Sequence, residues 1–467
     1  MALFSHRALF WRALQAPASV LLVGGIGLAT VNSATLQIGV GRKYATIPSA
    51  VAAASNGDTL EISPGTYSGA AAVTVIGKSL ILRGVGGRPI LDAAGYVIPN
   101  GKAIFVTSGP DITVENLEFK NATVPDRNGA GIRPEGAKLS VRSCYFHDNE
   151  NGIQGGAVGS EILVESCEFE HNGHGDGQSH NLYINVVGRF TFRFNYSHRG
   201  NVGHLLKTRA QENYILYNRL TDEVGGAASY EVDVPQGGLT FLIGNVIEQS
   251  GTTQNPTLIA YAEEGAKNTT NRLFLSHNTL VNDRNGGTFL FNAAVEPAVL
   301  INNLFIGTGT LTSGAASLTN NLTLDRSQVM NAPAYDVHLT ATAKAIDWGD
   351  APGVQDGFDL APGFEYVHPM TGLPRPVIGA LDVGAYECSD PAGIFLHFTG
   401  SEKTNAAVRL KWLGNPAMTR ILEASPVLSP PAWVPRATNH PGDAATGMGV
   451  IPTSEVPMYF RLRGTHL

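Results

Sequence analysis

The sequence predicts an all-β protein whose main part is a solenoid, the parallel β-helix. Nine segments combine an alternating apolar run with a small or Asn residue in the same register, and this residue recurs every 18 to 33 positions. Strand-like repeats of this length are typical of solenoids, because each coil can bury its apolar face only against its neighbours. Only 15% of the residues are charged and 54 of the 467 are Gly, which favours short strands linked by tight turns.

One position of the repeat forms a column that should stack from coil to coil. Asn side chains there can hydrogen-bond to their copies in the next coil, and Asn tolerates the left-handed conformation of a turn. Two Cys precede the Asn residues on adjacent coils, about one strand spacing (~4.8 Å) apart. A disulfide would fit, but two buried free thiols are the simpler interpretation. The column contains Leu117, Cys144, Cys167, Asn195, Asn218, Asn245, Asn278, Asn303 and Asn321.

The first 34 residues have the pattern of an export signal. Arg7 and Arg12 form a positive start, residues 18–31 are mostly apolar, and residues 32–34 are small enough for cleavage. The apolar run is short and interrupted by Gly, so we expect removal rather than a membrane anchor. The mature protein should then be secreted or periplasmic, with no membrane span.

The next stretch, Lys43 to Gly69, combines a short helix with a strand. Ile47, Val51 and Ala54 fall on one helical face, and the strand Thr59 to Ile62 follows. This stretch resembles the N-terminal cap of the pectate-lyase-like superfamily of right-handed β-helices, and 'KSLILRGVGGRPILDA' resembles the first coil after it. The resemblance implies a right-handed solenoid with a helical cap, which would cover the open sheet edge of the first coil.

The sequence changes character near its end. Short alternating strands such as 'VRLKWLG' and 'YFRLRG', with Trp412 or Trp433 as a buried Trp, predict a small antiparallel β-sandwich of the fibronectin-III kind, acting as a spacer or attachment module. Residues 326–387 are rich in Pro and Gly, and we expect them to pack back on the last coils. The predicted parts are a signal peptide (1–34), a β-helix domain that would carry any catalysis (35–390) and the sandwich module (391–467).

A second set of strands predicts which side chains face outward, because side chains alternate along a strand. If Leu182, Leu206 and Tyr230 point inward, Tyr183 and Lys207 lie on adjacent coils, about 4.8 Å apart at the backbone, and Arg209 lies roughly 7 Å along the strand. Two cations and a phenol on one outer face do not help the fold, since like charges repel. The alternative is a solvated surface whose cations pair with Glu231 and Asp233. The predicted outward row contains Arg133, Gln154, Tyr183, Lys207 and Glu231.

Such a cluster suits β-elimination of a polysaccharide that contains uronic acid. A guanidinium neutralises the substrate carboxylate and so acidifies the proton on the adjacent carbon. A base then removes that proton while an acid protonates the leaving glycosidic oxygen. Lys and Tyr both titrate near ~10, and a neighbouring guanidinium shifts the pKa of either one in the direction that a base requires.

The segments 'HNLYI' and 'GHLLKTRA' resemble β-helical alginate and polyglucuronate lyases. The resemblance implies that Lys207 and Tyr183 form the acid–base pair, with the base left open between them, and that Arg209 neutralises the substrate carboxylate. His180 and His204 could contact sugar hydroxyls or simply stack as a pair at a strand start. The expected substrate-binding residues are Asn181, Asn185, His180, His204, Arg133, Gln154 and Glu231.

The expected partner is an acidic polysaccharide bound by a monomer. A formal net charge of −7 and the lack of a basic stripe disfavour nucleic acid. We expect no metal or cofactor, although calcium binding through Glu231 and Asp233 stays open. Two other functions also stay open, a uronate C5-epimerase and a noncatalytic, glycan-binding surface β-helix.

Overall fold

The computed structural model describes residues 33–388, 396–404, 407–414, 419–426, 434–439, 446–452 and 459–465. The predicted signal peptide therefore lies almost entirely outside the described residues, and so does the boundary predicted at residue 390. No helix in the described part of the chain has the length and apolar character needed to cross a membrane.

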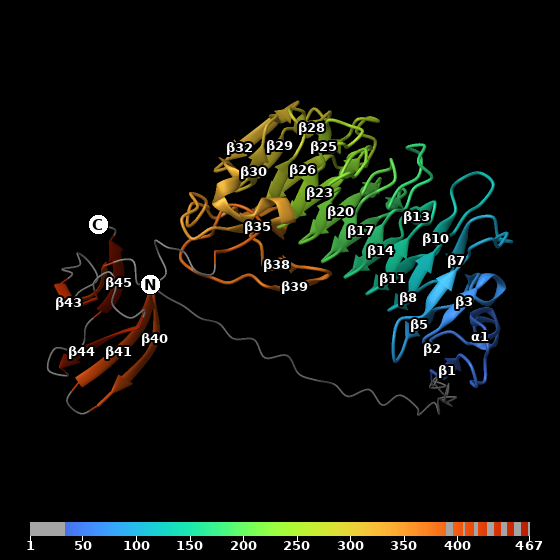
Figure 1. The fold of residues 1–467 in the computed structure, drawn as a ribbon, viewed down its shortest axis with the longest axis horizontal. Helices are drawn as coiled ribbons and strands as arrows, with labels where there is room; N and C mark the ends of the chain where they lie inside the picture. Colours follow the sequence, from blue (N-terminus) through green and yellow to red (C-terminus); the bar gives the residue numbers. More distant parts are fainter. Residues whose placement is uncertain are drawn as a thin grey trace, which may run out of the picture. The chain divides into compact units, whose positions relative to one another are not determined.

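Three parallel sheets run along a β-helix, and successive coils add one strand to each sheet (Figure 1). Sheet A has twelve strands: β1 (Thr35–Ile38), β2 (Thr59–Ile62), β5 (Leu80–Gly84), β8 (Ile112–Glu115), β11 (Lys138–Arg142), β14 (Glu161–Glu165), β17 (Arg189–Arg193), β20 (Glu212–Leu216), β23 (Leu239–Ile243), β26 (Arg272–Ser276), β29 (Ala298–Ile301) and β32 (Ala316–Thr319). Sheet B has eleven: β3 (Thr66–Ser68), β6 (Ile90–Asp92), β9 (Glu118–Lys120), β12 (Tyr145–His147), β15 (Glu168–Glu170), β18 (Tyr196–His198), β21 (Arg219–Thr221), β24 (Val246–Gln249), β27 (Thr279–Asn282), β30 (Leu304–Gly307) and β33 (Leu322–Leu324).

Sheet C, which carries the candidate site, has ten strands: β4 (Thr74–Ile76), β7 (Ala103–Thr107), β10 (Ala130–Pro134), β13 (Asn151–Gly155), β16 (Leu182–Ile184), β19 (Leu206–Thr208), β22 (Val232–Val234), β25 (Thr257–Tyr261), β28 (Thr288–Asn292) and β31 (Thr310–Ser313). The inward side chains of the three sheets form one continuous apolar core. That core fills the solenoid, so any ligand must bind to outward side chains or to the loops between sheets.

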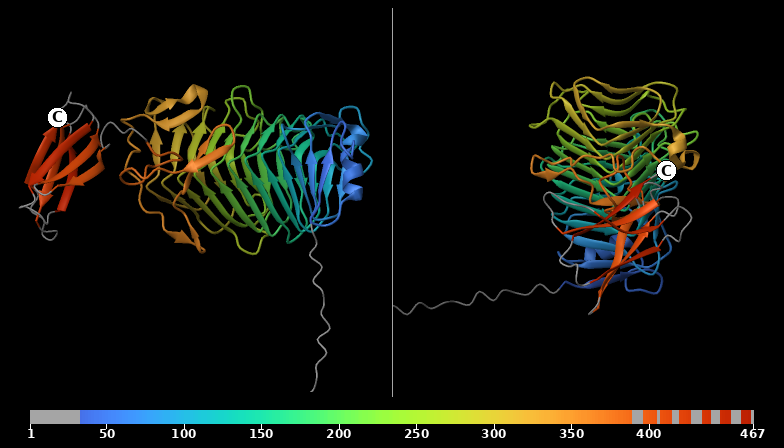
Figure 2. Two further views of the ribbon diagram at one scale, coloured as in Figure 1. Left: turned by 90° about the horizontal axis from the view of Figure 1, so that it is seen from below. Right: turned by 90° about the vertical axis from the view of Figure 1, so that its left-hand side faces the viewer.

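A short helix, α1 (Ile47–Ala53), lies at the N-terminal end of the solenoid (Figure 2). The hydroxyl of Thr46 accepts a hydrogen bond from the backbone N–H of Ser49, which satisfies one of the free donors of the first turn. Ile47, Val51 and Ala54, which the helical spacing places on one face, are all buried. A 3₁₀ turn, η1 (Gly69–Ala71), follows β3. The capping role of α1 stays a prediction.

The predicted Asn column forms a continuous hydrogen-bonded ladder between sheets A and B. The carboxamide of Asn218 donates to Oδ1 of Asn245 at 3.0 Å, and Asn245 donates in the same way to Asn278 at 2.9 Å. Each Oδ1 also accepts a backbone N–H from the preceding coil, at 2.9 Å for Asn218 N–H to Asn245. The ladder thus pairs backbone groups that the sheets leave free at this corner.

We expected the Asn residues of the column to adopt the left-handed conformation, but the residue directly before each of them in the sequence adopts it instead. The residue before each column member has the positive φ, for example 55° at Tyr217 and 53° at His277. The left-handed turn comes first and directs the following side chain inward, where it joins the ladder. Residues other than Gly pay for this conformation with local strain, which the ladder offsets.

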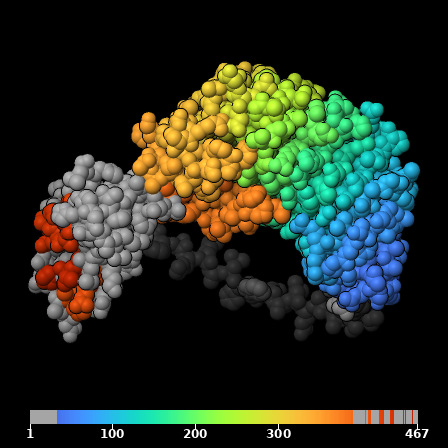
Figure 3. All heavy atoms as spheres, in the orientation of Figure 1, coloured from blue at the N-terminus to red at the C-terminus, as the bar shows by residue number. Residues whose placement is uncertain are grey.

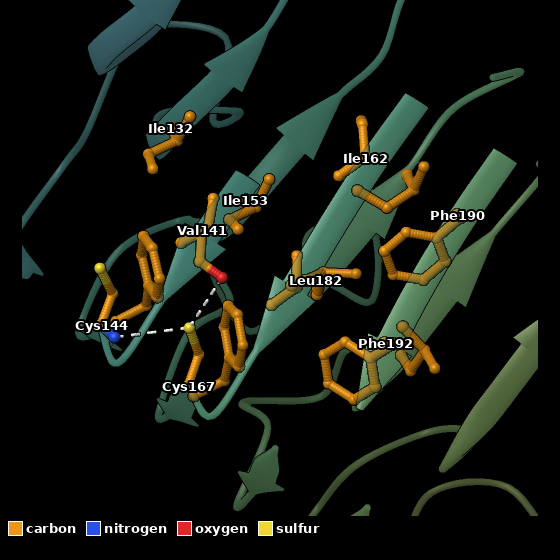
Figure 4. Close-up of a cluster of buried hydrophobic side chains, with 14 of the residues drawn as sticks. Ile132, Val141, Cys144, Ile153, Ile162, Cys167, Leu182, Phe190 and Phe192 are labelled. Atoms are coloured by element: carbon orange, nitrogen blue, oxygen red, sulfur yellow. Dashed lines mark hydrogen bonds between the residues drawn. The ribbon is translucent and has the colours of Figure 1, made fainter. Parts of the chain in front are cut away.

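Cys144 and Cys167 continue the ladder as free thiols, as predicted (Figure 4). The sulfur of Cys167 accepts the backbone N–H of Cys144 at 3.4 Å, the same bond that an Asn oxygen makes elsewhere in the column. Both thiols are fully buried among the apolar side chains of the core.

Residues 326–387 pack back on the last coils, as expected (Figure 3). Val329 and Tyr386 join an apolar cluster with Val281 and Ile306 of sheet B, and the hydroxyl of Tyr217 accepts the backbone N–H of Gly363 at 2.9 Å. The elements are η2 (Arg326–Gln328), β34 (Val329–Asn331), η3 (Ala332–Ala334), β35 (Asp336–Leu339), β36 (Val354–Gln355), β37 (Phe358–Asp359), β38 (Phe364–Val367) and β39 (Thr371–Pro374).

The C-terminal part contains two three-stranded antiparallel sheets. The strand order in one sheet is β40 (Leu396–Lys403), β41 (Ala407–Gly414), β44 (Thr446–Pro452). The strand order in the other sheet is β43 (Val434–Asn439), β42 (Thr419–Ser425), β45 (Tyr459–Thr465). Antiparallel pairing agrees with the predicted sandwich, whereas the likeness to fibronectin III stays a prediction. The side chain of Trp412 and the whole of Trp433 lie outside the described residues.

Candidate active site on sheet C

The outer face of sheet C brings the predicted acid–base pair together. Tyr183 on β16 pairs in register with Lys207 on β19, and Lys207 pairs with Asp233 on β22. The inward neighbours Leu182, Leu206 and Val232 are fully buried. The phenol, the amine and a carboxylate therefore lie side by side on three consecutive coils.

Lys207 lies between two acidic side chains. Its Nζ is 2.8 Å from Oδ2 of Asp233 and 3.8 Å from Oε1 of Glu264. The Lys207 side chain is 12% exposed and that of Asp233 is fully buried. The ammonium therefore compensates the charge of a buried carboxylate.

Arg209 forms a two-pronged ion pair with Glu264. Nη2 of Arg209 is 2.5 Å from Oε1 of Glu264, and Nε is 3.1 Å from Oε2. The same guanidinium lies over the ring of Tyr183, with its central carbon 4.9 Å from the ring centroid. The three residues to which the sequence assigns catalysis thus form one cluster, with Glu264 as an additional member.

Glu264 reaches the cluster because a long loop folds back across the strands. We call residues 262–271 the clasp loop; it follows β25 and precedes β26. The side chain of Asn268 donates to the carbonyl oxygens of Ala210 at 2.9 Å and Gly237 at 2.8 Å, and its own oxygen accepts from Gln211 at 2.7 Å. These bonds tie the loop to two earlier coils, so Glu263 and Glu264 lie over the outward row.

Glu263 and Asp233 form a hydrogen-bonded carboxyl pair beside Lys207. Burial, together with the hydrogen bond to Asp233, raises the pKa of Glu263 to about 8, and burial also raises the pKa of Asp233. Two such close carboxyl groups titrate as a unit, and we expect them to share one proton near neutral pH. With Glu264 ionised, the two negative charges balance those of Lys207 and Arg209.

His180 and His204 stack on each other beneath this cluster. Their ring centroids are 4.4 Å apart, and Nδ1 of His180 accepts the backbone N–H of His204 at 3.0 Å. Nδ1 of His204 accepts from Tyr230 N–H at 3.1 Å, which leaves the Nε2 proton facing Asp233 at 3.3 Å. Burial, with Lys207 and Arg209 nearby, lowers the pKa of His180 to about 3. Both imidazoles are therefore neutral. They are buried under the cluster, with His180 3% and His204 6% exposed.

Two of the expected substrate contacts were wrong. Glu231 is fully buried, and its charged neighbours are Asp222 and Glu248 rather than Lys207. We expected Tyr230 next to Leu206 on the inner face, but Val232 occupies that position. The predicted register of this strand was therefore wrong by two residues. Asp233, on the outer face, fills the place that was given to Glu231. The two carboxylates thus have different charged neighbours.

Asn181 is also buried, and its carboxamide is fully used inside the solenoid. It accepts from Asn172 at 3.1 Å and donates to the carbonyl oxygen of His198 at 2.8 Å. Asn149 and Asn172 form the steps before it, so Asn181 ends a second Asn ladder, at the corner between sheets B and C. A substrate on the outer face cannot reach it.

Three other expected contacts, Arg133, Gln154 and Asn185, lie on the outside of the solenoid, whereas His180 and His204 are buried. Gln154 pairs in register with Tyr183, and its Oε1 accepts a hydrogen bond from Arg133 at 2.8 Å. Both side chains are half-buried, and Asn185, which follows β16, is exposed. Gln154 and Arg133 can extend the outward row on the side of Tyr183 away from Lys207, and Asn185 lies on the same coil as Tyr183.

The buried carboxyl of Glu231 predicts a pH-dependent stability. Burial raises the pKa of Glu231 well above its usual value, and Asp222 and Glu248 raise it further. A carboxyl with a raised folded-state pKa stabilises the fold below its unfolded pKa, and this contribution disappears as the pH rises through the folded pKa. We expect Glu231→Gln to melt near the wild-type temperature at acidic pH and above it at alkaline pH.

Thermal melting across the pH range, with the exposed Glu296 changed to Gln as a matched control, would measure this difference. Each pH unit above the unfolded pKa should widen the gap by at most about 1.4 kcal/mol. An equal shift at all pH values would instead mean that the fold does not raise the pKa of Glu231 above its unfolded value.

The sequence interpretation missed Glu263, Glu264 and Asn268. The first two close the phrase 'LIAYAEE' at the end of a sheet C strand, a position where charged side chains reach the outer face. The position of Glu263 and Glu264 could therefore have been predicted from the sequence. The anchoring role of Asn268 had no local signal, because its partners lie 31 and 58 residues earlier in the chain.

Comparison with known proteins agrees with this architecture. A family described as "Right handed beta helix region" matches residues 95–233. The crystal structure of pectate lyase Pel9A is similar at a TM-score of 0.54 and 14% sequence identity, over 77% of this chain and 98% of that chain. Among curated proteins, none matches the sequence. The protein thus has the right-handed parallel β-helix fold that pectate lyases also adopt.

Proposed function

We propose that the protein is a polysaccharide lyase that cleaves a uronic-acid-containing polymer, of the alginate or polyglucuronate type, by β-elimination. The main observation in support is the outward cluster of Tyr183, Lys207 and Arg209 on adjacent coils of sheet C. A polymer could lie along the outward row, past Gln154 and Arg133. Because such a polymer is too large to enter a cell intact, we propose a secreted or periplasmic location.

In this proposal each residue of the cluster has one role. Arg209 neutralises the substrate carboxylate, which acidifies the proton on the adjacent carbon. Lys207 and Tyr183 exchange protons with that carbon and with the leaving glycosidic oxygen. Asp233 positions the amine through its ion pair with Nζ of Lys207 at 2.8 Å, and Nε2 of His204 lies 3.3 Å from the same carboxylate.

The proposed reaction should not need a divalent metal. Lys207 and Arg209 already compensate the carboxylates of the cluster, and we expect one proton to be shared by the Asp233–Glu263 pair. We expect the elimination rate to be unchanged by EDTA and by added calcium. A rate that falls with EDTA and returns with calcium would show instead that these carboxylates act as metal ligands.

A panel of alginate, polyglucuronate and pectate tests the proposal. Elimination creates a conjugated double bond, so the ultraviolet absorbance of the products should rise with at least one polymer. Binding without a rise would favour the noncatalytic β-helix. Inverted configuration at the carbon beside the carboxylate, with an intact chain, would favour the epimerase.

A further inference from the structure

We propose that Glu264 is an internal stand-in for the substrate carboxylate, which the incoming uronate must displace from Arg209. This inference rests on the proposed function and specifies the chemistry that the site selects. It follows from three properties of Glu264, namely where its oxygens lie, how exposed it is, and which part of the chain supplies it.

The oxygens of Glu264 lie where a uronate carboxylate would have to bind. Oε1 lies between the two cations, 2.5 Å from Nη2 of Arg209 and 3.8 Å from Nζ of Lys207. Oε2 takes the second prong of the guanidinium at 3.1 Å. A planar carboxylate fits a guanidinium fork in this way, and the proposed reaction requires the same fit from the substrate. Both cannot occupy the fork at once.

Glu264 is also the outermost member of the cluster. Its side chain is 35% exposed, compared with 15% for Arg209 and 12% for Lys207. A polymer that approaches the outer face therefore meets Glu264 before it meets either cation. Burial pushes the pKa of Glu264 upward, but the hydrogen bond and charge of Arg209, with Lys207, lower it overall. The group is thus a carboxylate at neutral pH.

The side chain can leave without disturbing the strands. Glu264 belongs to the clasp loop, not to sheet C, so its departure breaks no strand pairing. The loop backbone is anchored through Asn268. A rotation of the Glu264 side chain is then enough to open the fork of Arg209 while the clasp loop stays in place.

This arrangement selects for charge. A neutral sugar that displaced Glu264 would leave the guanidinium of Arg209 without a counter-ion, whereas a uronate replaces the lost carboxylate directly. The site should therefore discriminate against neutral polysaccharides even where their ring shapes are similar.

Isothermal titration of the full chain with sodium glucuronate tests the inference. This monosaccharide carries the carboxylate but no glycosidic bond, so its binding is independent of cleavage. We expect Glu264→Gln, which removes the competing charge at equal size, to bind glucuronate about tenfold more tightly than the wild type, a gain of about 1.4 kcal/mol. Glu264→Ala should change affinity in the same direction, and glucose should bind to none of these proteins.

Glu296→Gln, the same substitution at an exposed site on the next coil, is the matched control and should leave the affinity unchanged. Equal or weaker glucuronate binding by both Glu264 variants, with wild-type melting temperatures, would overturn the inference. The proposed lyase activity is judged separately on the polymer panel. If the Glu264 variants bind glucuronate more tightly but no polymer is cleaved, the lyase proposal is rejected and the role of Glu264 is retained. If a polymer is cleaved but the variants do not bind glucuronate more tightly, the lyase proposal is retained and the role of Glu264 is rejected.

Discussion

Lys207→Ala is expected to lower the elimination rate by about a thousandfold, the middle of the range for a lost acid–base group. Lys207 is the amine of the outward row, next to Tyr183 in register and 2.8 Å from Asp233. No other Lys among the described residues lies on this row. The rate of appearance of the unsaturated product, on the polymer that responds in the panel, measures the effect.

Two further substitutions define the role of the amine. Lys207→Arg keeps the positive charge next to Asp233 but cannot release its proton near neutral pH. If Lys207 exchanges protons, this variant should be as inactive as the Ala variant. Lys138→Ala is the matched control, since Lys138 lies on sheet A with a side chain that is 51% exposed. Full activity in Lys207→Arg would mean that the amine acts only through its charge.

Asn245→Ala is expected to lower the free energy of unfolding by about 3 kcal/mol, the largest stability effect that we predict for a single side chain. The Asn245 carboxamide donates to Ile215 O at 2.8 Å and to Asn278 at 2.9 Å, and it accepts two hydrogen bonds from Asn218. Removal leaves buried donors and an acceptor without partners, which is costlier than the loss of an exposed hydrogen bond. Urea denaturation followed by circular dichroism measures the change.

The column itself supplies a graded control for this prediction. Cys167 already substitutes for Asn, with its sulfur accepting a backbone N–H at 3.4 Å. Asn245→Cys should therefore lose less stability than Asn245→Ala. Asn185→Ala, at an exposed site, should change the free energy of unfolding by less than about 0.5 kcal/mol. Equal losses in all three variants would contradict the role that we give to the ladder.

The sequence predicted those features that repeat from coil to coil. The Asn column followed from its period, and the pairing of Tyr183 with Lys207 followed from the alternation in 'LYI' and 'LKT'. The prediction failed where a coil departs from the repeat. The loop between β21 and β22 hides the start of the next strand, so Tyr230 was placed inward and Glu231 outward, and the register moved by two residues.

The clasp loop lay beyond prediction for a different reason. The periodicity of a sequence predicts which side chains share a face, but it does not predict the path of a loop or its contacts with distant coils. The position of Glu264 depends on hydrogen bonds from Asn268 to coils that are distant in the sequence. Local patterns therefore gave the cations of the site and missed the carboxylate that pairs with them.

Mass spectrometry of the products formed in heavy-oxygen water tests the central claim most directly. Elimination breaks the glycosidic bond without adding water, so the account predicts oligosaccharides with one unsaturated end and no heavy oxygen from the cleavage. A hydrolase would give saturated fragments that carry the label. Labelled, saturated fragments, or an uncut chain with every uronate polymer, would contradict the proposed β-elimination at Tyr183, Lys207 and Arg209.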